Sequence, residues 1–360
     1  MRIIELARNF SYNDGISRVI FELSKKLKKK HDVEVIYNYS SGEPIKFPSK
    51  QLGQLETINY VSKNADIVHT HFGLSLAFAD MSKKINSNLK HVYTYHVNPP
   101  REVTGSSWFD YKKINMGIYL GVKGGVDKVV AISKYAKIDF LEKYGKPEPI
   151  VIYNGVDTEK FVPNKKSGRS FREKHNISSD CFLLGYLARF SFQKNHPFLI
   201  RLAKELPKDI KIVLAGNPNT GAKSTYNYCK ELIKSLNLEE KIIVLENIPE
   251  NEITDFYNSL DVYVIPSLWE GFGLPILEAM SCEKPVVSLN SYVYPELVGG
   301  DKKNGFTAKN INEFKKQVLK LYSDSKLYKE TSKNAIKFAK TMDWEKKAEE
   351  YSKMMKKLVE

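Results

Sequence analysis

Short, nearly continuous apolar runs alternate with longer amphipathic segments along the first half of the chain. Uninterrupted apolar runs of this length are typical of strands that are buried on both faces of a parallel sheet. The clearest helical segment places Ile16, Val19, Ile20, Leu23 and Leu27 at helical spacing. Strands that alternate with helices predict βαβ units in a doubly wound α/β fold. The predicted strands cover residues 2–7, 33–37, 66–71, 91–96, 129–133 and 150–154.

The second half repeats this alternation, with strands predicted at 182–188, 211–216, 241–246, 261–266 and 285–289. Asn195-His196-Pro197 offers a cap and a proline suited to the start of a helix. Residues 157–180 are polar and contain Pro163 and Gly168, which predicts a linker there. The tail from residue 344 predicts a closing amphipathic helix. We therefore expect one domain over residues 1–160, a second over 170–340, and a C-terminal helix over 341–360.

Composition narrows the class of protein. The chain has 360 residues, enough for two domains of ordinary size. It has three cysteines without a CxxC pattern, which favours a reducing, cytoplasmic compartment over a disulfide framework or a zinc site. No apolar run has the length of a membrane span. The formal net charge of +14 favours polyanionic partners. No nucleic-acid-binding motif accompanies this charge, so we expect no nucleic-acid partner.

Polar residues follow the predicted strands at the edge where open α/β sheets bind ligands. Arg189 follows one predicted strand and Lys194 comes five residues later, before a predicted helix. A guanidinium group and an ammonium group beside a helix N-terminus suit a diphosphate. Two surface cations in a connecting loop would give the same pattern. Asn154 and Gly216 also stand at carboxyl ends of predicted strands, and we expect both to be donor-binding residues.

The most specific local feature is the run from Glu270 to Glu278, with Gly271, Gly273 and Pro275 between them. The glycines permit close backbone approach, and the proline suits the first turn of a helix. Carboxylates at these positions can accept hydrogen bonds from vicinal hydroxyls of a sugar and a ribose. A capping acid and a solvated helix glutamate are the structural alternative.

Gly15 lies between the first predicted strand and the first predicted helix, which is a phosphate-loop position, but also a common place for a tight turn. His69 and His71 lie two residues apart on one predicted strand, so their side chains point to the same side of the sheet. No carboxylate accompanies these histidines at ligand spacing, so we predict no metal site. His96 ends its predicted strand, and we expect it to line a cleft. A buried, hydrogen-bonded histidine is the alternative.

The chain resembles the family-4 retaining glycosyltransferases, which have the GT-B fold of two facing Rossmann-like domains. The strongest likeness is the segment Pro-Ser-Leu-Trp-Glu-Gly-Phe-Gly-Leu-Pro-Ile-Leu-Glu-Ala-Met at residues 266–280, which is similar to the family's E-x7-E segment. Supporting segments are Asn-Gly-Val-Asp at 154–157, Ala-Arg-Phe at 188–190 with Lys194, Pro-Glu-Leu-Val at 295–298, and Asn-Gly-Phe at 304–306. Departures are Ala188, where the family usually has glycine, and a single glycine in the first loop.

The resemblance implies a donor site in the cleft between the domains. Arg189 and Lys194 would hold the donor diphosphate, Glu270 the sugar hydroxyls, and Glu278 the ribose. The backbone near Gly271, Phe272, Gly273 and Leu274 would approach the sugar and phosphates, as would the loop at Gly15. His96 would lie near the reacting carbon, on the acceptor side.

The implied reaction is retaining hexosyl transfer from a UDP- or GDP-sugar to a glycan or lipid-linked acceptor. The chain has no Asp-x-Asp pair, and we therefore expect neither a metal nor another cofactor. A sugar-nucleotide epimerase and a non-catalytic sugar-nucleotide-binding protein are the alternatives. The missing GxGxxG pattern argues against a dehydrogenase. Lys25, Lys26, Lys28, Lys29 and Lys30 suggest peripheral binding to the anionic inner face of the cell membrane, or else a solvated helix face.

Overall fold

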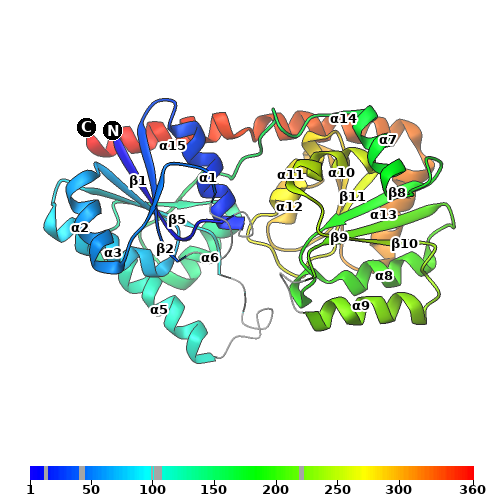
Figure 1. Cartoon of the computed structure of the whole chain (residues 1–360), viewed down its shortest axis with the longest axis horizontal. Coiled ribbons are helices and arrows are strands. Elements are labelled where there is room, and N and C mark those ends of the chain that lie inside the picture. Colours follow the sequence, from blue (N-terminus) through cyan, green and yellow to red (C-terminus); the bar gives the residue numbers. More distant parts are fainter. Residues whose placement is uncertain (12–14, 40–44, 99, 101–107, 219–222) are drawn as a thin grey trace. The chain divides into compact units, whose positions relative to one another are not determined.

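The chain folds into two compact units, which we describe separately (Figure 1). The computed structural model describes residues 1–11, 15–39, 45–98, 100, 108–218 and 223–360, without the side chains of residues 109, 110 and 302. Unit 1 comprises Met1–Gly155 and Trp344–Glu360, and unit 2 comprises Val156–Asp343. Within the described ranges, no helix combines the length and the apolar character that a membrane crossing requires.

Unit 1 is built on a parallel sheet that, over the described residues, has seven strands in the order β3-β2-β1-β4-β5-β6-β7. Its central strands are almost fully buried, which explains their uninterrupted apolar sequence. The strands are β1 (Arg2–Asn9), β2 (Asp32–Tyr39), β3 (Ser49–Gln51), β4 (Ile67–Thr70), β5 (Lys90–Tyr95), β6 (Lys128–Ala131) and β7 (Ile150–Val151). The helices are α1 (Gly15–Leu27), α2 (Gln54–Asn64), α3 (Gly73–Ile85), α5 (Trp108–Gly125), α6 (Lys134–Tyr144) and α15 (Trp344–Val359).

Helix α15 is the predicted closing helix, and it returns to unit 1. It packs along α1, and Figure 1 shows the two helices side by side near the chain termini. Trp344, Ala348, Tyr351 and Met355 form its buried face. Gly155 makes the return possible, because a Cβ atom there would lie 2.7 Å from the Trp344 ring. The C-terminal helix therefore belongs to the core of unit 1.

Unit 2 has a second parallel sheet, with six strands among the described residues, in the order β10-β9-β8-β11-β12-β13. The strands are β8 (Phe182–Leu187), β9 (Ile210–Gly216), β10 (Ile242–Glu246), β11 (Val262–Ile265), β12 (Val286–Leu289) and β13 (Gly305–Ala308). The α-helices are α7 (Lys165–Lys174), α8 (His196–Glu205), α9 (Lys223–Ser235), α10 (Ile253–Ser259), α11 (Leu274–Ser281), α12 (Tyr294–Leu297), α13 (Ile311–Ser323) and α14 (Ser325–Thr341). The short 3-10 helices in the described part of this unit are η1 (Phe192–Lys194), η2 (Glu250–Glu252) and η3 (Gly300–Lys302).

The sequence-based predictions differ from the structure at the sheet edges and between the units. Strands β3 and β13 were not predicted, and both are edge strands. The segment 157–180 is not a linker, because it contains α7 and packs on α10 in unit 2. Gly168 permits that packing, since a Cβ atom there would lie 2.4 Å from the Asn258 carbonyl oxygen. The division between the units falls at Gly155/Val156 and Asp343/Trp344 rather than at the predicted boundaries.

Each sheet reverses its winding direction at one pair of neighbouring strands. In unit 1 the chain winds outward from β1 to β3 and resumes at β4 on the other side of β1. In unit 2 the same reversal lies between β8 and β11. Ligands of open α/β sheets bind beyond the carboxyl ends of strands at such switch points. The loops after β1, β4, β8 and β11 are therefore the places to look for a site.

Candidate functional site

At the switch point of unit 2, an ion pair joins the loops that follow β8 and β11. The Lys194 ammonium group donates a hydrogen bond to Oε1 of Glu270. Both side chains are largely buried, with 15% and 13% of their surfaces exposed. The two residues lie 76 positions apart in the chain. The adjacency of β8 and β11 brings them together, as the sequence-based assignment of both residues to one site requires.

Hydroxyl groups hold the Glu270 carboxylate in place. Ser267 donates from Oγ to Oε1 of Glu270 over 3.0 Å, and the Tyr186 hydroxyl lies 2.7 Å from Ser267 Oγ. Burial, aided by the Glu270 charge, raises the pKa of Tyr186 well above its ordinary value, so its hydroxyl stays protonated. Sequence reasoning did not assign Ser267 or Tyr186 to the site. Both follow or lie on strands that end at the switch point, which is the signal that could have found them.

Arg189 lies directly after β8, and its side chain is exposed. Among the described residues, no carboxylate forms a salt bridge with it. The neighbouring backbone is tightly packed, because a Cβ atom on Gly216 would lie 2.1 Å from the Ala188 carbonyl oxygen. Gly216 therefore has a packing role at the end of β9, and its predicted contact with a donor stays a prediction. The tight packing fixes the position from which Arg189 extends.

Helix α11 begins where the sequence predicts, directly after the two glycines. Gly273 adopts φ of 89°, a left-handed conformation that favours glycine, and Pro275 occupies the first turn. Gly271 and Leu274 are partly exposed, whereas the Phe272 side chain is buried. Helix α11 begins four residues after Glu270 in the chain, and the first backbone N–H groups of a helix suit an anion.

Glu278 points into unit 2 rather than into solvent. Its side chain is 5% exposed, and its Oε2 accepts a hydrogen bond of 2.7 Å from the Tyr257 hydroxyl on α10. This bond links α10 to α11. The predicted contact of Glu278 with a ribose stays a prediction, and the structure gives the residue a structural role as well.

In unit 1, a buried cluster replaces the pair of histidines that the sequence suggested. His69 and His71 share a partner on the neighbouring strand, since Oε2 of Glu5 lies 2.9 Å from His69 Nδ1 and 2.8 Å from His71 Nε2. All three side chains are buried. Burial alone would raise the pKa of Glu5, but the charges and hydrogen bonds of the two histidines lower it to about 2. Glu5 is therefore a carboxylate at neutral pH.

The sequence-based statement that no carboxylate accompanies these histidines is wrong. Glu5 lies opposite His69 in the register of β1 and β4. The ligand atoms of Glu5, His69 and His71 lie within 4.8 Å of one another, close enough for a metal ion. In the structure these atoms bond to one another, and we interpret the group as a hydrogen-bonded cluster. The signal was a single charged residue inside the apolar run Ile3-Ile4-Glu5-Leu6-Ala7.

His96 lies directly after β5, and its side chain is partly exposed. Its Nε2 lies 2.9 Å from Nδ1 of His71, which connects it to the buried cluster. Burial, together with the neighbouring His71 and His69, lowers the pKa of His96 well below its ordinary value. The next residue, Val97, has φ of 64°, which is rare for a β-branched residue and marks a constrained turn.

The other two predicted site residues of unit 1 have contrasting surroundings. Gly15 is exposed as the first residue of α1, and a Cβ atom there would meet no atom within 4 Å. Asn13 and Asp14, which belong to the same predicted loop, lie outside the described residues. Asn154 is buried and precedes Gly155, the residue at which the chain leaves unit 1 for unit 2. The donor contacts expected of Gly15 and Asn154 stay predictions.

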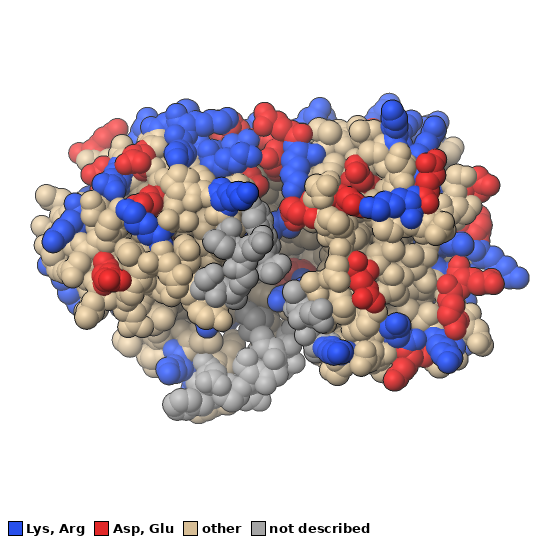
Figure 2. Space-filling view, viewed as in Figure 1, with Lys and Arg blue, Asp and Glu red and all other residues tan. Residues whose placement is uncertain are grey.

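The lysines at the end of α1 and in the turn that follows it are less available than their sequence suggested. Lys29 and Lys30 form ion pairs with Glu345 and Glu349 of α15, at 2.6 and 2.5 Å, and Lys26 is buried. Figure 2 shows basic and acidic side chains intermixed over the visible surface. The packing of α15 thus neutralises part of the predicted polybasic face.

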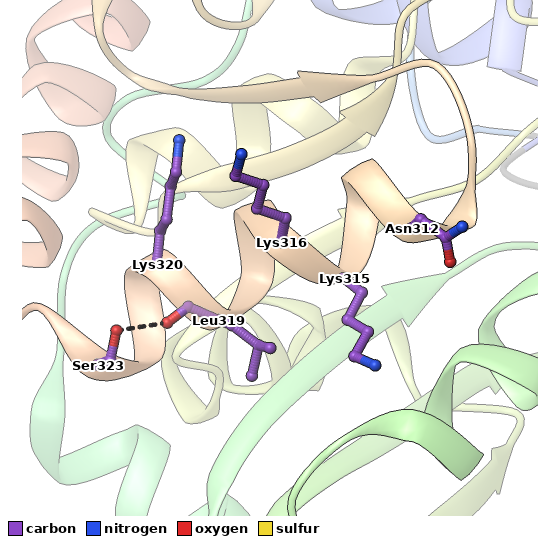
Figure 3. Close-up of a pocket in the computed structure, with 6 residues that line it drawn as sticks. All are labelled: Asn312, Lys315, Lys316, Leu319, Lys320 and Ser323. Atoms are coloured by element: carbon purple, nitrogen blue, oxygen red, sulfur yellow. Dashed lines mark hydrogen bonds between the residues drawn. The ribbon is translucent and has the colours of Figure 1, made fainter.

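A surface hollow in unit 2 lies along α13, and none of the predicted site residues lines it (Figure 3). Its lining consists of Asn312, Lys315, Lys316, Leu319, Lys320 and Ser323. All six residues come from one helix, and none is a carboxylate. Lys315 forms an ion pair with Glu205. We assign no function to this hollow, because surface lysines alone do not build a binding site.

Comparison with known proteins connects both units to one enzyme family. The model for glycosyltransferase family 4 matches residues 13–160, and the model for glycosyl transferases group 1 matches residues 168–338. An uncharacterized glycosyltransferase of Methanocaldococcus jannaschii is 26% identical over 96% of this chain and 95% of its own length. The O-antigen biosynthesis glycosyltransferase WclY of Escherichia coli is 27% identical over 79% of this chain and 78% of its own length.

Solved structures support the fold. The Anabaena HepE protein, crystallised with UDP and glucose, superimposes with a TM-score of 0.86 at 20% identity, covering 99% of this chain and all of that chain. Sucrose-phosphate synthase from Thermosynechococcus elongatus superimposes with a TM-score of 0.82 at 17% identity over 99% of this chain and 98% of its own. With two parallel Rossmann-like sheets and both family models matched, the chain belongs to the group-1, family-4 glycosyltransferases and has their GT-B fold.

Proposed function

We propose that the protein transfers a sugar, with retention of configuration, from a nucleoside-diphosphate sugar to a glycan or a lipid-linked acceptor. The observation that carries this proposal is the Lys194–Glu270 pair at the switch point of unit 2, with the exposed Arg189 on the same loop as Lys194. The pair combines a cation for a phosphate with a carboxylate for sugar hydroxyls. UDP in the crystal structures of the similar HepE protein supports a uridine nucleotide as the first donor to test.

Arg189 and Lys194 are proposed to hold the diphosphate without a metal ion. An exposed guanidinium group can bind two phosphate oxygens at once, and Lys194 supplies a second positive charge. The charge of the diphosphate rises as the glycosidic bond breaks. Cations already in place stabilise this developing charge more strongly than the ground state, and this difference lowers the barrier.

Retention is proposed to proceed by attack on the face from which the diphosphate leaves. A carboxylate nucleophile would need access to the sugar, and Glu5, the carboxylate of the unit 1 cluster, is buried beneath two histidines. The leaving phosphate can instead take the proton of the acceptor hydroxyl. His96 is proposed to contact the transferred sugar. Trapping of a covalent sugar on any side chain would contradict this mechanism.

The test is an acceptor-dependent transfer assay with UDP-, GDP- and ADP-sugars, in the presence of EDTA. The proposal predicts nucleotide release and a new glycosidic bond only when acceptor is added, with the donor's anomeric configuration preserved in the product by NMR. Conversion of the donor sugar without acceptor would support the epimerase alternative. Binding of nucleotide without turnover over any acceptor class would support the non-catalytic alternative.

We also propose that unit 1 binds an anionic membrane surface through one face of α5. Trp108, Met116 and Leu120 are 56%, 57% and 60% exposed there. Lys112 and Lys123 lie over the rings of Trp108 and Tyr119, at 3.9 and 5.7 Å from their centres. The sequence from Tyr111 to Gly125 contains no acidic residue.

Aromatic and apolar side chains interleaved with lysines suit the boundary between lipid headgroups and acyl chains. The opposite side of α5 packs on α3, where a Cβ atom at Gly121 would lie 2.5 Å from Leu76. Among the described side chains, no carboxylate forms a salt bridge with Lys112 or Lys123, whereas Lys29 and Lys30, which follow α1, pair with glutamates of α15. This difference moves the predicted membrane contact from α1 to α5.

The test is co-sedimentation with vesicles of phosphatidylglycerol and, separately, of phosphatidylcholine. We expect binding to the anionic vesicles at low salt, reduced at least about tenfold in a Trp108→Ala/Leu120→Gln variant. Leu55→Gln is the matched control, because Leu55 is 74% exposed on α2 of the same unit. Equal binding by both variants, or no binding by the unaltered protein, would contradict the proposal.

A further inference from the structure

A chain of hydrogen bonds runs from the interior of unit 1 to its surface. It begins at Glu5 on β1, passes through His71 after β4 and ends at His96 after β5, with contacts of 2.8 and 2.9 Å. Glu5 and His71 are buried, whereas His96 is partly exposed. The strand register explains the alignment, because Glu5 pairs with His69 and His69 pairs with Val92, which places all these residues on one face of the sheet.

The position of each proton along this chain follows from its first member. A carboxylate only accepts hydrogen bonds, so Nε2 of His71 must carry a proton and donate it to Glu5. Burial lowers the pKa of His71 to about 4, so the ring is neutral at pH 7 and its Nδ1 has a free lone pair. That lone pair accepts from His96, whose Nε2 must therefore carry a proton. A neutral His96 with this proton has a bare Nδ1.

We propose that Glu5 and His71 are positioning residues that hold His96 as the Nε2-protonated tautomer, with Nδ1 presented to accept a hydrogen bond from a substrate hydroxyl. This inference rests on the proposed transfer function, because a sugar or acceptor hydroxyl is the ligand it requires. The partner of a histidine's second nitrogen commonly decides which nitrogen carries the proton. Here the buried Glu5 carboxylate decides which nitrogen of His96 carries the proton, and it does so through His71, which bonds to both residues.

The surroundings of the chain support this proton arrangement. His69 on β4 occupies the remaining side of Glu5, and its Nε2 lies 2.7 Å from Thr94 Oγ1. Tyr351 of α15 covers the same face, with its hydroxyl 3.1 Å from Thr94. Burial raises the pKa of Tyr351 well above its ordinary value, so it adds no charge. Among the described residues in contact with the chain, Glu5 is the carboxylate that can orient His71.

The direct test is ¹⁵N NMR of the histidine side chains of the unaltered protein at pH 7, with and without EDTA. The His96 signals are assigned by their loss in His96→Gln. We expect a protonated Nε2 and a bare Nδ1, unchanged by EDTA. A protonated Nδ1 with a bare Nε2, a charged ring, or a spectrum that changes when metal is removed would overturn the proposal. This experiment needs no substrate, so its outcome is independent of the transfer assay.

A pair of variants tests the role of the chain in the reaction. In Glu5→Gln the amide can donate to His71, which reverses the protons along the chain. We expect mixed or reversed His96 tautomers, kcat lowered at least about tenfold, a shifted pH profile of kcat, and an unchanged donor KM. His91→Gln is the control, since His91 is equally buried on β5 but bonds to Thr70 outside the chain. A folded Glu5→Gln protein with the His96 spectrum and pH profile of the control would overturn the proposal.

Discussion

The two units place polar groups at the same edge of similar sheets but expose them to different degrees. In unit 1 the carboxylate of Glu5 is fully buried, and hydrogen bonds through His71 connect it to the partly exposed His96. In unit 2 Lys194 and Glu270 contact each other directly, and both retain some exposure beside the exposed Arg189. We infer that unit 2 supplies charge to a ligand, whereas unit 1 supplies one neutral, oriented histidine.

The largest effect should come from removing charge in unit 2. Lys194→Ala removes the proposed phosphate contact and leaves the largely buried Glu270 without its cation, so we expect kcat/KM to fall by about 10²–10³. Steady-state kinetics of the variant checks this. Lys174→Ala is the matched control, because Lys174 forms a comparable but more exposed pair with Glu252 in the same unit. Equal rates in the two variants would remove Lys194 from the site.

The next effect concerns two glycines that the sequence assigned to the same kind of role. Gly216→Ala would place a Cβ atom 2.1 Å from the Ala188 carbonyl oxygen, and we expect it to lower the free energy of unfolding by about 2–3 kcal/mol. Gly15→Ala has open space around it and should change stability by less than about 0.5 kcal/mol. Urea denaturation of both variants measures the difference. Similar destabilisation by both changes would contradict this distinction.

The smallest effect is an acid sensitivity that differs between the units. Burial lowers the pKa of His71 to about 4 and of His91 to about 3 in unit 1, and of His196 to about 3 in unit 2. A neutral buried histidine contributes full stability above pH 6.5, and this contribution is lost as the pH falls toward the folded-state pKa. At pH 5 His91 and His196 should each cost about 2 kcal/mol.

The contribution of Glu5 to stability is lost in a lower pH range. Its pKa is lowered from 4.5 to about 2, so this contribution is lost only as the pH falls between those two values. Between pH 7 and pH 5, unit 1 should lose more stability than unit 2, because His71 and His91 both lie in unit 1, whereas His196 lies in unit 2. Hydrogen exchange of peptides from each unit, corrected for the intrinsic pH dependence of exchange, measures this. Greater loss in unit 2 would show that His71 or His91 is already charged at pH 7.

The same contrast explains how much of the site the sequence could predict. Arg189 and Lys194 lie within six residues, and Glu270 to Glu278 within nine, so their pattern is visible along the chain. Glu5 acts on His71 from 66 positions away, and only the pairing of β1 with β4 brings them together. A lone glutamate inside an apolar strand was the available signal. The pairing of Lys29 with Glu345 spans 316 positions and has no local signal.

The fold followed from local pattern except where that pattern is weak. Buried central strands gave continuous apolar runs, and the predicted elements there agree with the structure within a few residues. Strand β3 is Ser49-Lys50-Gln51, which has no apolar residue and forms its ladder on one side only. Such an edge strand is formed by its hydrogen bonds to the neighbouring strand β2, and its own sequence has no apolar pattern that would predict it. The polar segment around α7 was taken for a linker because its buried face is small, with Gly168 and Phe171.

The central claim is that unit 2 binds a nucleoside diphosphate through Arg189 and Lys194 without a metal ion. The most direct measurement is the melting temperature with UDP, GDP and ADP in EDTA, for the unaltered protein and for Lys194→Ala. At about one hundred times the dissociation constant, binding should add about 2.7 kcal/mol and raise the melting temperature by roughly 5–10 °C with at least one nucleotide. We predict that this shift is lost in Lys194→Ala. A shift that requires a divalent ion, or that survives in Lys194→Ala and Arg189→Ala, would contradict it.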